Sequence, residues 1–272
     1  MPLYQAVVLA IVQGIAEFLP ISSTGHLILF PWLLGWKDPG LTFDVALHAG
    51  TLVAVLIYFW RTWVEMLAAA AGLGRGDPVV VRQKRRLFWY LIVATIPGGI
   101  IGLLFEKAAD EQLRQPVIIG FALVIVALLM WAGEVRGRRQ EKLEDVGLGS
   151  ALFVGVAQSL AVIPGVSRSG ITMTAGLFSG MDRETDARFS FLLSTPIIAG
   201  AALKKGLEVH KHGLPPGMHL PFIVGILVSA AVGYGVIAWL LRFLSTRTFK
   251  PFIVYRLALG VLVLALGWGL RH

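Results

Sequence analysis

The same polar turn occurs twice in this chain, inside sequence that is otherwise apolar. The segment QGIAEFLPISSTGH at 13–26 returns in altered form as QSLAVIPGVSRSGI at 158–171, which is 145 positions later and without a gap. Polar groups at membrane depth are tolerated mainly where they line a cavity. The repeat therefore predicts one composite site to which both halves of the chain contribute.

Composition places the rest of the chain in a membrane. Hydrophobic residues make up 56% of the sequence and charged residues only 15%, and the mean hydropathy is +0.76. Such a chain cannot cover a water-facing surface, so we predict an all-α polytopic membrane protein. The net charge of +8 does not indicate nucleic acid as a partner, because the basic residues lie in short connections between apolar runs. The absence of cysteine excludes disulfides and thiol catalysis.

Hydropathy predicts six transmembrane helices and two re-entrant helical hairpins. Segments 2–35 and 148–181 are apolar runs broken midway by the polar turn, which is typical of a re-entrant hairpin. The six spans, each near the length that a bilayer requires, are 43–60, 85–105, 117–134, 186–203, 221–243 and 252–270. A hairpin plus three spans reverses the direction of the chain. We therefore interpret 1–272 as a single membrane domain built from an inverted repeat, 1–134 and 148–272.

The distribution of charge predicts the orientation. Lys and Arg are concentrated in the connections 61–84, 135–147, 182–185 and 244–251. Since cytoplasmic connections are rich in these residues, we predict that all four are cytoplasmic and that both termini lie outside. The first hairpin then enters the membrane from outside and the second from the cytoplasm, so that the two turns meet near mid-membrane.

Two polar residues precede the first turn. Gln13 and Glu17 are four residues apart and so share a helix face. A carboxylate among apolar neighbours is costly unless it is paired, protonated or bound to a cation, which indicates a functional role for Glu17. The alternative is an interfacial glutamate that caps or hydrogen-bonds the neighbouring turn.

The first turn, PISSTGH at 20–26, combines hydroxyl groups with an imidazole. If a helix begins here, Ser23 lies near its N-terminus, where backbone N–H groups and the helix dipole favour an anion. The same position suits a hydroxyl nucleophile, with His26 three residues later as its base. The alternative is that Ser22, Ser23 and Thr24 only cap a broken helix and that His26 is an interfacial residue.

The second turn, PGVSRSGIT at 164–172, adds a positive charge. Arg168 is the only cation inside either predicted turn, and a guanidinium there is costly without an anionic partner. Its fork fits phosphate oxygens, and Ser167, Ser169 and Gly170 supply further donors. A structural ion pair between Arg168 and Glu17 is the alternative, and both interpretations can hold for the empty protein. Together the two turns predict phosphoryl chemistry.

At these residues the chain resembles the bacterial undecaprenyl-diphosphate phosphatase family, also called bacitracin-resistance proteins. The resemblance rests on [EQ]xxxE at Gln13 and Glu17, on PISSTGH at 20–26 and on PGVSRSG at 164–170, and it covers essentially the whole chain. It implies an enzyme that removes the terminal phosphate from the C55 isoprenoid diphosphate and so recycles the lipid carrier for peptidoglycan synthesis. It also implies the bacterial inner membrane, a site open to the periplasm, and a divalent cation, Mg²⁺ or Ca²⁺.

The resemblance also implies roles for individual residues. Ser23 is the expected nucleophile, His26 and Glu17 assist proton transfer or metal binding, and Arg168 grips the phosphate. Residues expected to bind phosphate are Ser22, Thr24, Gly25, Ser167, Arg168, Ser169 and Gly170. Glu17 and Gln13 would hold the metal. Members of the family carry Glu at the first of these positions, and the amide oxygen of Gln13 is a weaker ligand than a carboxylate.

Several alternatives stay open at this level. Ser22 and a water molecule are rivals to Ser23 as the attacking group. A transporter or flippase for undecaprenyl phosphate would use the same inverted repeat and Arg168, but it needs no nucleophile and base. His48 is interpreted as a residue for packing or a local hydrogen bond, with a place in the lining of the cavity as the alternative, and Asp44 as a solvated residue near the interface. Membrane lipids surround the chain, and a homodimer is left open.

Overall fold

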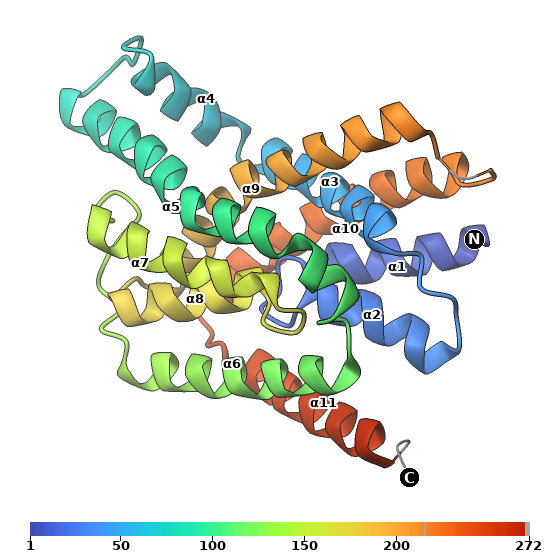
Figure 1. The fold of residues 1–272 in the computed structure, drawn as a ribbon. Helices are drawn as coiled ribbons and strands as arrows, with labels where there is room; N and C mark the ends of the chain where they lie inside the picture. Colours follow the sequence, from blue (N-terminus) through green and yellow to red (C-terminus); the bar gives the residue numbers. More distant parts are fainter. Residues whose placement is uncertain (215, 270–272) are drawn as a thin grey trace.

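The protein is a bundle of helices (Figure 1). In this computed structural model, residues 1–214 and 216–269 are described, without the side chains of residues 106, 110, 111 and 268. The elements are α1 (Leu3–Ala16), α2 (Ser23–Leu34), α3 (Leu41–Tyr58), α4 (Trp60–Ala70), α5 (Pro78–Glu111), α6 (Pro116–Arg136), α7 (Leu148–Gln158), the 3₁₀ helix η1 (Ser159–Val162), α8 (Arg168–Ser179), α9 (Arg183–His212), α10 (His219–Leu244) and α11 (Lys250–Gly269). The predicted all-α polytopic membrane class is confirmed. Residues 270–272, which end the second predicted repeat, lie outside the described residues.

Among the described residues, five helices are long and apolar enough to cross a membrane, namely α3, α5, α6, α10 and α11. They correspond to five of the six predicted spans, although 43–60 runs two residues past the end of α3 and residue 270 lies outside the described residues. The sixth, 186–203, lies within α9, which has 30 residues but carries several Ser and Thr residues and Pro196 along its length. These polar residues make α9 less apolar than the other five, and some of them face the site described below.

Two pairs of short helices correspond to the predicted hairpins. α1 and α2 have 14 and 12 residues, and α7 and α8 have 11 and 12, so each is too short to cross a bilayer alone. α1 packs against α10, and its counterpart α7 packs against α5. Both contacts use a glycine, since a Cβ added to Gly14 would lie 2.7 Å from the Val232 Cβ and one added to Gly155 would lie 2.7 Å from the Ala94 Cα. The pairing is what a two-fold repeat would produce, but the inverted repeat itself stays a prediction.

The connection 61–84 contains helices that hydropathy did not predict. Residues 60–70 form α4, and α5 begins already at Pro78. The Asp77 carboxylate accepts a hydrogen bond from Val79 N at 2.8 Å, and proline is well suited to the first position of a helix. This start signal extends α5 well beyond the apolar part of the span, so only a short turn separates α4 from α5.

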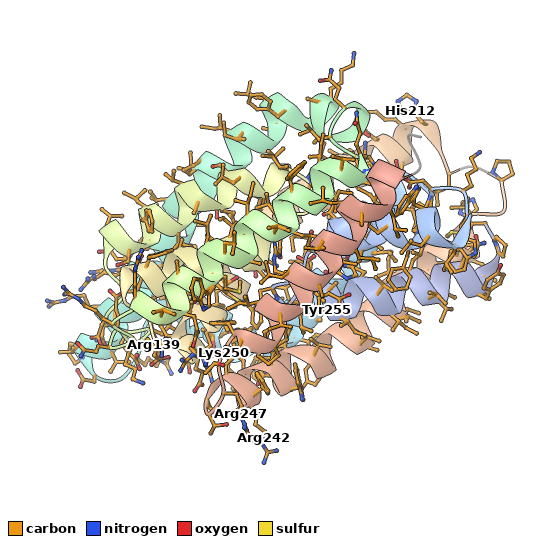
Figure 2. The ribbon with its side chains drawn as sticks, turned by 90° about the horizontal axis from the view of Figure 1, so that it is seen from below. Arg139, His212, Arg242, Arg247, Lys250 and Tyr255 are labelled. Atoms are coloured by element: carbon orange, nitrogen blue, oxygen red, sulfur yellow. The ribbon has the colours of Figure 1, made fainter. Side chains whose placement is uncertain are left out.

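The two ends of the bundle differ in charge. Arg139, Arg242, Arg247 and Lys250 lie at one end of the molecule and His212 at the other (Figure 2). The connections 135–147 and 244–251 therefore share an end, as the orientation predicted from charge requires. Which side of the membrane that end faces stays a prediction. Between the ends, large apolar side chains are exposed around the outside, where lipid would contact them, among them Leu103, Leu104, Leu227, Val254 and Val261.

Candidate functional site

Each polar turn ends in a serine that caps the following helix. α2 begins at Ser23 and α8 at Arg168, so the helix starts expected from the sequence are present. Ser22 and Ser167 precede them with φ of 80° and 73°, a region that non-glycine residues rarely occupy. Ser22 Oγ accepts from Gly25 N at 3.2 Å and Ser167 Oγ accepts from Gly170 N at 3.0 Å. These caps offset the cost of the backbone strain and orient both helix N-termini.

Glu17 is the centre of the site. Its carboxylate is 4% exposed and accepts hydrogen bonds from both halves of the chain. Ser23 Oγ donates to Glu17 Oε2 at 2.7 Å, and Gln13 Nε2 donates to the same oxygen at 3.0 Å. Arg168 Nη2 donates to Glu17 Oε1 at 2.8 Å. The structure thus brings together the proposed acid, hydroxyl and cation, and the ion pair considered from the sequence is present.

Arg168 is also held from α9. Its Nη1 donates to Ser190 O at 2.8 Å, and the Ser190 hydroxyl lies 2.7 Å from Thr172 Oγ1. Arg168 Nε is buried and has no hydrogen-bond partner among the residues that the structure describes. The guanidinium is therefore oriented by Glu17 and α9 but keeps a donor available, which suits it to bind an additional anion.

His48 lies next to Glu17, the place that the sequence analysis gave only as the alternative for it. Its Nδ1 lies 2.7 Å from Asp44 O, which is the expected local hydrogen bond, but its Nε2 lies 3.3 Å from Glu17 Oε2. A carbonyl can only accept, so Nδ1 carries a proton. Nε2 then faces a carboxylate oxygen and is attractive only if it is protonated as well, or if a cation lies between them. Glu17 therefore faces, from α3, either a doubly protonated His48 or a cation that lies between the two side chains.

Asp44 is buried rather than solvated. It is 2% exposed, and Arg114, from the connection between α5 and α6, pairs with it at 3.1 Å and with Asp38 at 2.8 Å. The sequence contains one sign that Asp44 and His48 belong together: they are four residues apart and so share a face of α3. That spacing shows a common face but does not show that the face is turned toward Glu17.

His26 is not paired with Ser23. Its Nδ1 lies 2.7 Å from Ser22 O and its Nε2 lies 2.7 Å from the Tyr255 hydroxyl. The hydroxyl of Ser23 donates to Glu17 instead. The prediction that His26 is the base for Ser23 is therefore not supported by this geometry, because α2 turns the imidazole toward α11 and not toward Glu17.

Arg256, in α11, contacts both turns, and the sequence analysis did not predict this. Its side chain is fully buried. The guanidinium donates to Pro20 O of the first turn at 3.1 Å, and to Gly165 O and Val166 O of the second turn at 2.9 and 3.0 Å. Two further bonds reach carbonyls of α6. A single arginine in an otherwise apolar predicted span was the available signal.

The other predicted phosphate-binding residues surround these contacts. Ser169 Oγ donates to Leu19 O at 3.1 Å, which ties the second turn to the first. The amides of Gly25 and Gly170 are bonded to their caps, and Thr24 is half-buried in the first turn of α2. The first backbone N–H groups of α2 and α8 have no partner within their own helices, and this leaves donors for an anion at both N-termini.

The residues around Glu17 fit one divalent cation. Within the part of the chain that the structure describes, Gln13 Oε1 is buried without a hydrogen-bond partner. The Nε2 atom of the same amide donates to Glu17 Oε2, which also faces His48 Nε2. A carboxylate oxygen, an amide oxygen and an imidazole nitrogen are a usable donor set, although weaker than two carboxylates. Among the described residues there is no group of three or more His, Cys, Asp and Glu side chains that could hold a metal ion. The cation stays a prediction.

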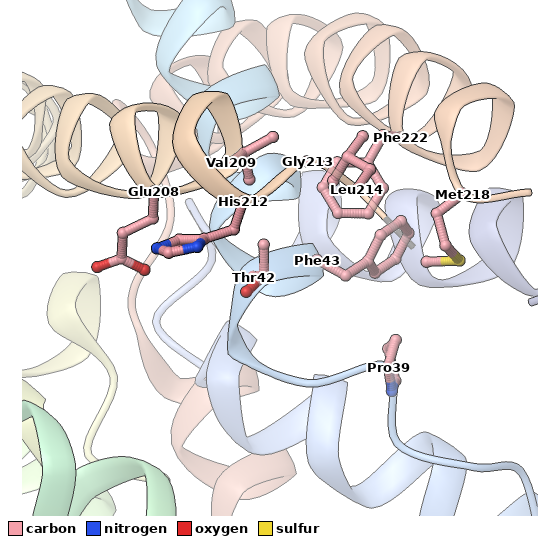
Figure 3. Close-up of a pocket in the computed structure, with 10 residues that line it drawn as sticks. All are labelled: Pro39, Thr42, Phe43, Glu208, Val209, His212, Gly213, Leu214, Met218 and Phe222. Atoms are coloured by element: carbon pink, nitrogen blue, oxygen red, sulfur yellow. The ribbon is translucent and has the colours of Figure 1, made fainter. Parts of the chain in front are cut away.

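A separate pocket opens at the His212 end of the bundle (Figure 3). Its volume is about 260 Å³, and it lies between the start of α3 and the connection from α9 to α10. Phe43, Leu214, Met218 and Phe222 line its apolar side, and Glu208 and His212 line its polar side. None of the site residues predicted from the sequence lines it, so this pocket is distinct from the site at Glu17.

Comparison with known proteins agrees with these motifs. A sequence profile of the family described as "Bacitracin resistance protein BacA" matches residues 6–262. The chain is 52% identical to an undecaprenyl-diphosphatase of Moorella thermoacetica, over 98% of this chain and 99% of that protein. It is 48% identical to an undecaprenyl-diphosphatase of Trichlorobacter lovleyi, over 98% and 97% of the two chains, and 44% identical to one of Pelotomaculum thermopropionicum, also over 98% and 97%.

Proposed function

Because the chain belongs to the bacitracin resistance protein BacA family, we infer that it is an integral-membrane undecaprenyl-diphosphatase. It hydrolyses undecaprenyl diphosphate to undecaprenyl phosphate and inorganic phosphate. The transporter alternative is not favoured, since the relatives are named as hydrolases. The inner membrane, a site open to the periplasm and a homodimer stay predictions.

One observation supports hydrolysis at this site more than any other. Glu17 accepts hydrogen bonds from the Ser23 hydroxyl at 2.7 Å and from the Arg168 guanidinium at 2.8 Å. The carboxylate that would act as the base therefore contacts both a hydroxyl and a phosphate-binding cation. A carrier needs the cation but not the paired base and hydroxyl.

The two steps of the reaction follow from these contacts. In the first, Ser23 Oγ bonds to the terminal phosphorus while the anhydride P–O bond breaks, and Glu17 accepts the proton of Ser23. Undecaprenyl phosphate leaves, and a phosphoserine remains. In the second, a water oxygen bonds to the phosphorus while the bond from phosphorus to Ser23 Oγ breaks, and Glu17 returns its proton to Ser23. One water proton stays on the inorganic phosphate and the other passes to solvent.

Arg168 has a different partner in each state. Without substrate it neutralises Glu17, and its buried position makes an unpaired charge costly. When the diphosphate binds, phosphate oxygens compete for the guanidinium, so that Glu17 is released to accept the proton of Ser23. A divalent cation held by Glu17 and Gln13, when bound, would add positive charge next to the terminal phosphate.

The direct test is phosphate release from undecaprenyl diphosphate by the purified protein in detergent, with and without a chelator. We expect release by the unaltered chain, a lower rate with chelator, and about 10³-fold slower release by Glu17→Gln, which keeps the shape but removes the base. If the unaltered protein released no phosphate but exchanged lipid across vesicles, the transporter alternative would replace this proposal.

A further inference from the structure

Two consecutive residues of α11 contact the two turns. Arg256 is fully buried and donates to backbone carbonyls of both turns, including Pro20 O at 3.1 Å and Gly165 O at 2.9 Å. A buried guanidinium with several carbonyl acceptors has little freedom to move. Arg256 therefore holds this part of α11 at a fixed distance from the first turn, and with it the neighbouring residue, Tyr255.

Tyr255 contacts His26 by both its ring and its hydroxyl. The ring centroids are 5.7 Å apart with an interplanar angle of 11°, and the Tyr255 hydroxyl lies 2.7 Å from His26 Nε2. On the other side of the imidazole, Nδ1 lies 2.7 Å from Ser22 O. Since a carbonyl can only accept, Nδ1 carries the proton, and in the neutral imidazole Nε2 accepts from Tyr255.

The Ser22 carbonyl thus sets which nitrogen of His26 is protonated, and the Tyr255 hydroxyl donates to the other nitrogen and holds the ring in place. The Nδ1 bond transmits the ring's position to Ser22. Ser22 is the strained cap residue, with φ of 80°, and Ser23 follows it. A change at Tyr255 would therefore reach the nucleophile through two hydrogen bonds and one peptide unit.

We propose that Tyr255 is a positioning residue for the hydrolysis. It holds the imidazole of His26 in one orientation, and through Ser22 it holds the turn that presents Ser23 to Glu17. Tyr255 is 43% exposed and His26 only 5%, and Tyr255 lies between the two ends of the bundle (Figure 2). It therefore also covers His26 toward the lipid-facing surface. This inference rests on the function proposed above.

Tyr255→Phe removes the hydroxyl and keeps the ring stacked on His26. We expect kcat to fall about fivefold to tenfold, the effect of one lost hydrogen bond, while KM changes less than about twofold, because Tyr255 does not bind the phosphates. Tyr234→Phe is the matched control. Tyr234 is 46% exposed on α10 and its ring contacts Tyr58, so this variant should retain the parent kcat. An unchanged kcat in Tyr255→Phe would overturn the proposal.

A second measurement does not depend on turnover. In protein labelled with ¹⁵N-histidine, the His26 signals are identified by their absence in His26→Asn. We expect one protonated and one unprotonated nitrogen in the parent, and a shift of the Nε2 signal in Tyr255→Phe but not in Tyr234→Phe. Unchanged His26 signals would reject the positioning role even if the parent protein were an active phosphatase. The expected shift would persist even if phosphate release were absent.

The double variant separates positioning from general destabilisation. If Tyr255 acts through His26, adding Tyr255→Phe to His26→Asn should cause no further loss of kcat. A further fivefold to tenfold loss in the double variant would show that Tyr255 acts independently of His26, and the proposal would fail.

Discussion

The two hairpins have the same backbone conformation at their turns, but their turns carry different functional groups. In both, a serine with positive φ accepts a hydrogen bond from the glycine amide three residues later, at 3.2 Å for Ser22 and 3.0 Å for Ser167. The next residue is Ser23 in the first hairpin and Arg168 in the second, and both donate to Glu17. The same turn geometry, used twice, therefore brings a hydroxyl and a cation to one carboxylate. Neither hairpin alone contains all three groups.

The hairpins also differ in how they are held. α8 packs against α6, α7 and α9, whereas α2 packs mainly against α1 and only lightly against α6. The first hairpin depends more on single side chains, because Tyr255 holds His26 and Arg256 holds Pro20 O. The half that carries the nucleophile is thus positioned by specific polar contacts, and the half that carries the cation by extensive packing.

Removing the cation of the second hairpin should have the largest effect. We expect Arg168→Ala to show no measurable phosphate release, because the phosphates lose their clamp and Glu17 loses its partner at 2.8 Å. Arg168→Lys should recover little, since an ammonium lacks the forked geometry. Arg188→Ala is the control, because Arg188 lies in α9 and pairs with Glu184 at the surface. Near-normal turnover by the Lys variant would reject the clamp.

Removing the hydroxyl of the first hairpin should come next. We expect Ser23→Ala to slow phosphate release by about 10²- to 10³-fold and to leave lipid binding largely intact, since Arg168 and the turn amides remain. Ser22→Ala should be milder, because the Ser22 hydroxyl serves as a cap. The rate of phosphate release and the affinity for the lipid, measured on the same samples, check both expectations. A Ser23→Ala rate close to the parent would move the attack to Ser22 or to a water activated by Glu17.

The caps should behave alike in the two hairpins. Ser22→Ala and Ser167→Ala each lose one cap bond, and we expect each to lower stability by about 1 kcal/mol. Glycine at either position should lower stability by only a few tenths of ~1 kcal/mol, since glycine adopts positive φ without strain. Thermal unfolding in detergent measures the difference, with the exposed Ser245→Ala as control. Alanine and glycine variants of equal stability would contradict the argument from positive φ.

Orientation can be tested with no expected loss of activity. Gly76 and Gly213 lie in exposed turns, and among the described residues nothing lies within 4 Å of a Cβ added at either. Both have positive φ, 104° and 74°, so a side chain there strains the turn locally, far from the site at Glu17. The chain has no native cysteine, so Gly76→Cys and Gly213→Cys can be probed singly on intact cells with an impermeant thiol reagent. We expect labelling of Gly213→Cys only, with phosphate release within about twofold of the parent. The reverse pattern would overturn the predicted orientation of both hairpins.

The sequence predicted features that depend on near neighbours in the chain. The helix starts at Ser23 and Arg168 are set by capping serines, each of which accepts a hydrogen bond from the residue three positions later. The contact between Gln13 and Glu17 is a consequence of their spacing of four residues. The apolar runs that form α3, α5, α6, α10 and α11 follow from the length of a bilayer. The helical boundary at Pro78 was readable from Asp77 and Pro78 but was obscured by the charged residues that follow.

The tertiary structure alone decided which distant groups meet at Glu17 and His26. Arg168 lies 151 positions from Glu17, Tyr255 lies 229 from His26, and Arg256 lies 236 from Pro20. Periodicity shows which residues share a face of one helix, but not which helix that face contacts. That choice depends on the packing of all the helices together, where small residues such as Gly14 and Gly155 permit close approach. His48, Tyr255 and Arg256 could therefore be assigned to the site only after the helices were packed.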